Sequence, residues 1–213
     1  MKFATILVTR SKSCHVKTLH TILKFNILCI QTGNQNQIVF VNDDPYEKVE
    51  TVQNCLKSGN YDRILFVDFG VGVDEDSLKQ ATLPHEGLGC LVFPGVKEGV
   101  DWEMFKQKVR DTECSEPTSQ MGLHFDTEVS KKIGENIYNV SSTGARAWVM
   151  FTKNLIKQAK DKKTGNLKLH HKMFEKMKEQ GVKIYAYTSS KLTMSYTHEC
   201  ISNILSAAGV KAS

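Results

Sequence analysis

The first 68 residues alternate between short apolar runs and longer segments with helical spacing, and this alternation restricts the fold more than any other feature. The runs Phe3–Val8, Ile38–Val41 and Ile64–Val67 each have the length and composition of a strand. Strands that alternate with helices form βαβ units, in which the strands are parallel and the crossovers are right-handed. The sequence therefore predicts an α/β fold with a Rossmann-like N-terminal half.

Two amphipathic helices are predicted between these strands. In the first, apolar residues recur at helical spacing: Val16, Leu19, Ile22, Leu23 and Ile27. The second begins at Asp44 and Pro45, because Asp suits an N-cap and Pro suits the first turn. It ends at Ser58-Gly59-Asn60, and its inner face is expected to consist of Val49, Val52 and Leu56.

The second half of the chain is less regular. Apolar runs predict strands at Leu88–Phe93 and Val182–Tyr187, and further apolar segments lie at Ile137–Val140 and Ala145–Phe151. Helices are predicted at Trp102–Val109, Lys153–Lys160, His170–Gln180 and His198–Ala208. Residues 111–122 are polar and turn-rich, which predicts a loop. Together with the first half, these segments predict one domain with a central mixed, mostly parallel sheet of roughly six strands flanked by helices.

Composition excludes several classes of protein. Hydrophobic residues make up 40% of the chain and charged residues 24%, as in an ordinary globular domain. No segment approaches the ~18 apolar residues of a membrane span, and no small-residue cleavage site follows the N-terminal apolar run. The net charge of +5 is accompanied by no nucleic-acid-binding motif, so we do not expect a nucleic-acid partner.

The cysteines indicate a reducing compartment. None of the six stands at CxxC spacing, which favours free thiols and a cytoplasmic protein over a disulfide framework or a zinc site. They are Cys14, Cys29, Cys55, Cys90, Cys114 and Cys200.

Polar clusters follow each of the first three predicted strands: Thr9-Arg10-Ser11, Asn42-Asp43-Asp44 and Asp68-Phe69-Gly70. Parallel strands place their carboxyl ends at one edge of the sheet, where ligands bind in open α/β folds. We therefore expect these clusters to converge and to hold a nucleotide. The chain has neither GxGxxG nor GxxxxGK[ST], so a bound diphosphate needs another counter-charge, which a divalent cation on Asp68 would supply.

Structural roles compete with these functional ones. Asp68 could equally end its strand as a turn-capping residue, and Asp44 could serve only as a helix cap. The acidic run Asp74-Glu75-Asp76 is better explained by a helix N-terminus than by a metal site.

Three longer segments resemble the GT-A glycosyltransferases, most of all retaining enzymes of the glycogenin and galactosyltransferase kind. YDRILFVDFGVGVDEDSLKQ is similar to the strand and D-x-D motif that hold Mn²⁺ and the donor diphosphate in that family. VSSTGARAWVMFTKNLIK and LHHKMFEKMKEQGVKIYAY are similar to the family's later strand–helix segments. The whole chain also resembles the small glycosyltransferase domains of chlorella viruses that build capsid glycans. The resemblance implies a GT-A-like domain over residues 1–213, with a nucleotide-binding half (1–95) and an acceptor and donor-sugar half (96–213).

Carried over by position, the resemblance implies a nucleotide and metal site. Asp68 matches the first carboxylate of the metal motif, whereas Gly70 stands where the family has its second Asp. The donor-binding residues implied are Thr9, Arg10, Ser11, Asp43, Asp44, Asp68, Phe69 and Gly70. His198 is implied as a further ligand of Mn²⁺ or Mg²⁺, and His170, His171 and Arg146 as catalytic residues, although a histidine in such a helix is more often structural.

The expected activity is transfer of a sugar from a UDP-sugar to a glycan or glycoprotein acceptor, with retention of configuration. The setting would be the cytoplasm, which for a viral protein means that of the host. Two alternatives stay open: a nucleotidyltransferase of similar topology, and a non-catalytic descendant that binds nucleotide or protein. The sequence defines neither the sugar, nor the acceptor, nor an oligomeric state, and it is compatible with a domain of a larger protein.

Overall fold

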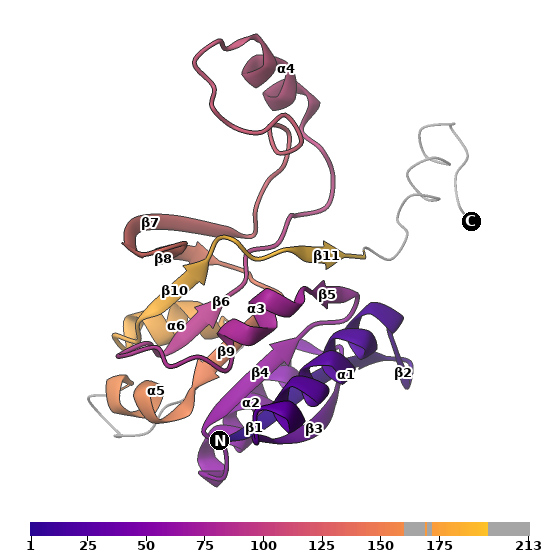
Figure 1. The fold of residues 1–213 in the computed structure, drawn as a ribbon, viewed down its shortest axis with the longest axis vertical. Helices are drawn as coiled ribbons and strands as arrows, with labels where there is room; N and C mark the ends of the chain where they lie inside the picture. Colours follow the sequence, from indigo (N-terminus) through magenta and orange to yellow (C-terminus); the bar gives the residue numbers. More distant parts are fainter. Residues whose placement is uncertain (160–168, 170–171, 196–213) are drawn as a thin grey trace.

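The computed structural model describes residues 1–159, 169 and 172–195 and shows a mixed sheet with helices on both faces (Figure 1). Within these residues the main sheet has nine strands. Eight follow the order β2-β1-β4-β9-β6-β10-β8-β7, and the ninth, β3, pairs with the edge of β1 that faces away from β4. The strands are β1 (Lys2–Arg10), β2 (Ser13–Cys14), β3 (Gln35–Asn42), β4 (Arg63–Val67), β6 (Cys90–Val92), β7 (Thr127–Gly134), β8 (Ile137–Thr143), β9 (Ala147–Phe151) and β10 (Ile184–Tyr187). A separate small sheet pairs β5 (Val71–Val73) with β11 (Leu192–Met194).

The helices are α1 (Val16–Gln31), α2 (Pro45–Ser58), α3 (Glu75–Gln80), α4 (Trp102–Arg110), α5 (Thr152–Gln158) and α6 (Met173–Glu179). Each of the predicted helices within the described residues is therefore present, with shifts of a few residues at the ends. The helix predicted at His198–Ala208 lies outside the described residues.

The N-terminal half has the predicted βαβαβ topology. β1 is parallel to β3 on one side and to β4 on the other. Asp44 caps α2 by accepting hydrogen bonds from the backbone N–H groups of Tyr46 and Glu47, Pro45 occupies its first turn, and Gly59 ends it in a left-handed conformation. These local signals predict the start and the end of α2 correctly because each depends only on residues adjacent in the sequence.

The second half adds mostly antiparallel strands. β9 lies antiparallel between β4 and β6, β10 runs parallel to β6, and β8 and β7 complete the edge antiparallel to their neighbours. The predicted mixed sheet is confirmed, but it has more than the six strands expected. The largest omission is β7, whose sequence TEVSKKIG is almost fully exposed and has no apolar run to reveal it.

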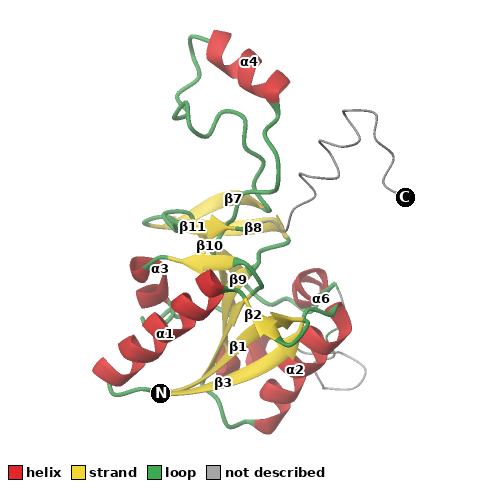
Figure 2. Ribbon diagram, turned by 90° about the vertical axis from the view of Figure 1, so that its right-hand side faces the viewer, coloured by secondary structure: helices red, strands yellow, loops and turns green. Residues whose placement is uncertain are grey.

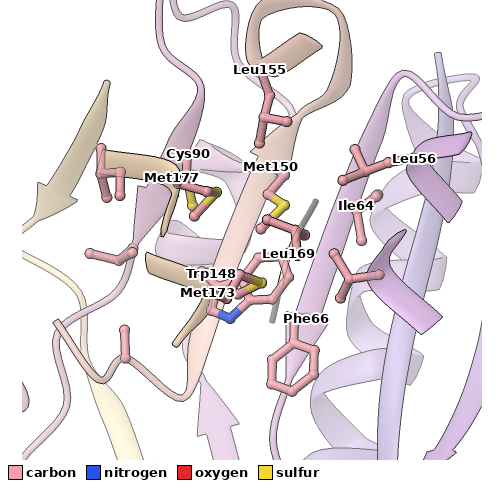
Figure 3. Close-up of a cluster of buried hydrophobic side chains, with 14 of the residues drawn as sticks. Leu56, Ile64, Phe66, Cys90, Trp148, Met150, Leu155, Leu169, Met173 and Met177 are labelled. Carbon is pink, nitrogen blue, oxygen red and sulfur yellow. The ribbon is translucent and has the colours of Figure 1, made fainter. Parts of the chain in front are cut away.

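Helices α1 and α3 lie on one face of the sheet and α2 and α6 on the other (Figure 2), and each face carries a hydrophobic core. Along β4, Ile64 and Phe66 face α2 and α6, whereas Leu65 and Val67 face α1 and α3. On the first of these faces the rings of Phe66 and Trp148 stack with centroids 4.8 Å apart, among the side chains drawn in Figure 3. Burial on both faces explains why the central strands are continuous apolar runs rather than alternating ones.

The apolar stripe that predicts α1 is not the face that α1 buries. Of the five residues that define it, Ile22 alone is buried, and Val16, Leu19, Leu23 and Ile27 are exposed. The buried face consists of Thr18, Thr21, Ile22, Phe25 and Cys29.

Residues 96–126 form an arm that extends away from the sheet and carries α4 (Figure 1). An isolated bridge between Val96 and Phe125 closes the base of the arm. α4 buries none of its residues, and Trp102 and Val109 are exposed. The predicted loop at 111–122 lies in this arm and has no regular secondary structure.

Among the described residues, no helix is long and apolar enough to cross a membrane. The five cysteines in this part of the chain are all free thiols, as predicted. Burial raises the pKa of the Cys29 thiol to about 11, so it is protonated and unreactive at neutral pH.

Candidate nucleotide-binding site

The polar clusters after β1, β3 and β4 converge at one edge of the sheet. Strand register brings Thr9 beside Asn42, and Leu7 beside Val67, so the residues that follow these strands meet. The Arg10 guanidinium pairs with the Asp43 carboxylate and lies 4.8 Å from the centroid of the Phe69 ring. The convergence expected from parallel strand ends is therefore observed.

Asp68 is held at this edge by hydrogen bonds of both its backbone and its side chain. Its backbone N–H donates to the carbonyl of Arg146 at 2.9 Å, and its own carbonyl accepts from the hydroxyl of Thr18 at 3.0 Å. On the side chain, Oδ1 accepts from Lys48 Nζ at 2.9 Å and Oδ2 accepts from Arg146 Nε at 3.0 Å. Both carboxylate oxygens are thus engaged by cations, which the simple turn-capping alternative does not require.

Lys48 joins the two acidic clusters. Its ammonium pairs with Asp68 and also with Asp43, and the three side chains are only 15–20% exposed. Burial opposes ionisation of Asp43, but the hydrogen bonds and charges of Lys48 and Arg10 outweigh it and hold the pKa of that carboxyl below its usual range. The result is a continuous chain of alternating charges from Arg10 through Asp43, Lys48 and Asp68 to Arg146.

A cavity of about 380 Å³ opens beside this charge chain. Its polar side carries Lys48, Asp68 and Arg146, and its apolar side is built by Phe66 and Trp148 together with residues of α2 and α6. Its volume falls in the range of roughly 300–1,000 Å³ that is typical of small-molecule sites, as does the combination of apolar walls with a few convergent polar groups. Trp148 is therefore both a buried core residue and part of the cavity wall.

Other predicted donor-binding residues have structural roles in the described chain. The Thr9 hydroxyl donates to the carbonyl of Val41 at 3.0 Å, and the Asp44 carboxylate caps α2. Ser11 and Lys12 form the tight turn between β1 and β2, both with positive φ. The acidic run after β5 behaves as its structural explanation predicts, because Asp74 caps α3.

Gly70 is required by the backbone. Its φ is +79°, and a Cβ at this position would lie 2.6 Å from the carbonyl oxygen of Ser195. The Gly70 carbonyl in turn accepts from the Ser195 N–H at 2.8 Å, next to the pairing of β5 with β11. The second carboxylate of the family's metal motif could not be accommodated here without rebuilding this contact.

The metal site implied by the resemblance is not assembled from the described residues. Within residues 1–159, 169 and 172–195, no group of three or more His, Cys, Asp or Glu side chains is placed to hold a metal ion. Asp68 is already paired with two cations, so this donor set does not fit a divalent cation. His198, His170 and His171 lie outside the described residues, and their roles stay predictions.

Arg146 separates this cavity from a second one of about 410 Å³, and both are bordered by Thr143 and Gly144. The second cavity lies at the base of the arm and is also lined by Asp126. Asp126 Oδ1 accepts hydrogen bonds from the Gly95 N–H and the Thr127 hydroxyl, whereas Oδ2 is buried without a hydrogen-bond partner. Burial raises the pKa of Asp126 above its usual range against the opposing effect of these hydrogen bonds.

Sequence reasoning missed Lys48 and Asp126. A signal for Lys48 was available, since a lysine close to the N-terminus of α2 is unfavourable to the helix dipole unless an anion lies nearby. Asp126 gave no such signal, because its burial depends on Gly95, 31 residues away.

No protein-family model and no curated protein matches this sequence. Among solved structures, A197 from STIV is similar with a TM-score of 0.54 and 12% identity, over 92% of this chain and 87% of that one. A putative glucose-1-phosphate thymidylyltransferase from Bacillus anthracis has a TM-score of 0.46 and 11% identity, over 97% of this chain and 94% of that one. The galactosyltransferase LgtC has a TM-score of 0.30 and 9% identity, over 87% of this chain and 73% of that one. The likeness to A197 shows a common fold and no activity, and the two lower scores carry no inference.

Proposed function

We propose that this protein is a transferase that moves a sugar from a UDP-sugar to a glycan or glycoprotein acceptor. The observation that carries the proposal is the convergence of Arg10, Lys48 and Arg146 on the carboxyl edge of parallel strands, beside a cavity with apolar walls. This edge is where α/β folds bind nucleotides, and three cations there suit a diphosphate. The resemblance of the strand and its Asp68 to the donor-binding segment of GT-A enzymes supports the same assignment.

In this proposal the basic residues stabilise the departing diphosphate. Negative charge builds on the leaving group as the glycosidic bond breaks, and cations already held in place offset it without reorganisation. Asp68 and Asp43 hold Lys48 and the two arginines in position. Retention of configuration is proposed from the resemblance to retaining GT-A enzymes of the glycogenin and galactosyltransferase kind.

The acceptor is assigned to the second cavity and the arm. This cavity shares Arg146 with the diphosphate site and is lined at its other end by the arm residues Lys97 and Glu98. We therefore propose that residues 1–95 bind the nucleotide and that 96–213 bind the acceptor and donor sugar, with Arg146 reaching across. The reaction would take place in the cytoplasm, that of the host if the protein is viral.

A non-catalytic nucleotide-binding role is the second candidate. It is favoured by one observation, namely that both oxygens of Asp68 are already neutralised by Lys48 and Arg146. A nucleotidyltransferase of similar topology remains the other alternative, although this chain has a two-residue turn after β1 where such an enzyme would normally carry a glycine-rich phosphate-binding loop.

Hydrolysis and transfer assays with a panel of UDP-sugars test these alternatives. We expect slow hydrolysis of one UDP-sugar that falls about 10- to 100-fold in Asp68→Ala, because a charged hydrogen bond is worth about 1.5–3 kcal/mol. Product NMR would report the anomeric configuration. UDP binding without turnover would favour the non-catalytic role, and binding of another nucleoside triphosphate with indifference to UDP would contradict the proposal.

A further inference from the structure

We infer that this site binds the diphosphate of its nucleotide without a divalent cation, with the Lys48 ammonium occupying the position that a metal takes between two carboxylates. The inference rests on the proposed function, since it concerns the same nucleotide site. It differs from what the resemblance implies, which is a site dependent on Mn²⁺ or Mg²⁺.

The position of Lys48 is the first observation. Its Nζ lies 2.9 Å from Asp68 Oδ1 and also pairs with Asp43 Oδ1, so one cation bridges carboxylates that follow two different strands. A metal ion would bridge them in the same way. Here the bridging cation is covalently part of α2 and is largely shielded, with its side chain 20% exposed.

The second observation is that a further carboxylate cannot be added where the metal motif would have it. Gly70 needs its positive φ, and any side chain there would collide with the Ser195 backbone. Both oxygens of Asp68 also already accept hydrogen bonds from cations, Oδ1 from Lys48 and Oδ2 from Arg146. A divalent cation would have to displace Lys48 or Arg146 and would then be bound by few protein ligands.

The charge balance of the cluster favours an anion. Arg10, Lys48 and Arg146 face Asp43 and Asp68, so three cations against two carboxylates leave one net positive charge. A metal motif has the opposite balance before the metal binds, since its carboxylates exceed its cations. The cluster as built therefore attracts a diphosphate and repels a dication.

Titration of UDP in EDTA and in Mn²⁺ tests the inference directly. We expect the dissociation constant of the wild-type protein for UDP to agree within about twofold between the two conditions. For Lys48→Met we expect binding in EDTA to weaken about 10- to 100-fold, as for other charged hydrogen bonds, and to recover in part with Mn²⁺, because the vacated position between Asp43 and Asp68 then admits a metal.

Two control variants and two further measurements accompany the titration. Lys48→Arg keeps the charge and should bind UDP in EDTA nearly as well as the wild type. Lys153→Met is the matched control, because this exposed lysine pairs with Asp62 at the opposite end of β4. Electron paramagnetic resonance of Mn²⁺ should detect tighter metal binding by Lys48→Met than by the wild type, without reference to activity, and equal thermal unfolding would show that the variants are folded.

Two results would overturn the inference. UDP binding by the wild type that appears only with Mn²⁺ would mean that residues outside the described chain complete a metal site, and the proposed function would survive. Absence of UDP binding in both conditions would remove the proposed function together with the inference.

Discussion

Asp126, which lines the second cavity, is a partly buried carboxylate whose two oxygens have different surroundings. One of its oxygens ties the base of the arm to Gly95 and Thr127, while the other is buried without a partner. Burial of this oxygen without a partner disfavours the ionised form, which accounts for the direction of the pKa shift.

The raised pKa of Asp126 predicts that ionisation destabilises the protein. Between the ordinary pKa of an aspartate and the raised value, the folded state binds more protons than the unfolded state, so stability falls as pH rises through this window. In Asp126→Asn this contribution should be lost. Urea unfolding of both proteins at several pH values from 4 to 7 would measure it, and parallel curves would contradict the prediction.

Lys48 and Gly70 decide the chemistry of the first cavity at the same scale. Lys48 pairs with Asp68, the residue expected to bind a metal, and a side chain at Gly70 would collide with the Ser195 backbone. Each effect depends on a partner distant in the sequence, Asp68 for Lys48 and Ser195 for Gly70.

At the scale of elements, α1 shows that an apolar stripe and a buried face can differ. The buried face contains Thr18 and Thr21, whose hydroxyls bond the carbonyl of Asp68 and the N–H of Val73, so polar residues are needed where the helix meets β4 and β5. The exposed stripe of Val16, Leu19, Leu23 and Ile27 is more apolar and dominates the pattern.

Because this stripe is exposed, substitutions on the buried face of α1 should reduce stability more than substitutions in the stripe. The apolar pattern alone would suggest the reverse. Phe25→Ala should cost about 3–5 kcal/mol of unfolding free energy, because Phe25 is fully buried against Phe3. Ile27→Ala should change it by no more than about 0.5 kcal/mol, since its side chain is 54% exposed. Chemical denaturation checks both, and a large loss at Ile27 would indicate that the stripe is covered in solution.

In the whole molecule, the candidate nucleotide site and the arm are built from different parts of the chain. The charge chain is built from the ends of β1, β3 and β4, from α2 and from Arg146, and none of its residues belongs to the arm. The arm leaves and rejoins the sheet at adjacent points, where Lys97 donates its N–H to the carbonyl of His124 at 2.7 Å.

Removal of the arm should therefore separate donor binding from transfer. Replacing residues 98–123 by Asn-Gly connects Lys97 to His124 through a two-residue hairpin turn. We expect UDP affinity to stay within about twofold of the wild type, while transfer to an acceptor is lost. UDP titration and a transfer assay would measure the two, and a comparable loss of UDP affinity would show that the halves are not separable in this way.

Features that depend on neighbours along the chain could be predicted from the sequence. The alternation of strands and helices, the Asp44 cap and the Gly59 end of α2 follow from local propensity, and the meeting of the polar clusters follows from parallel pairing. Tertiary structure alone decided the rest. The exposed β7, the buried face of α1, the Lys48 bridge and the constraint on Gly70 all arise from contacts between distant segments, which leave no periodic or spacing signal in the sequence.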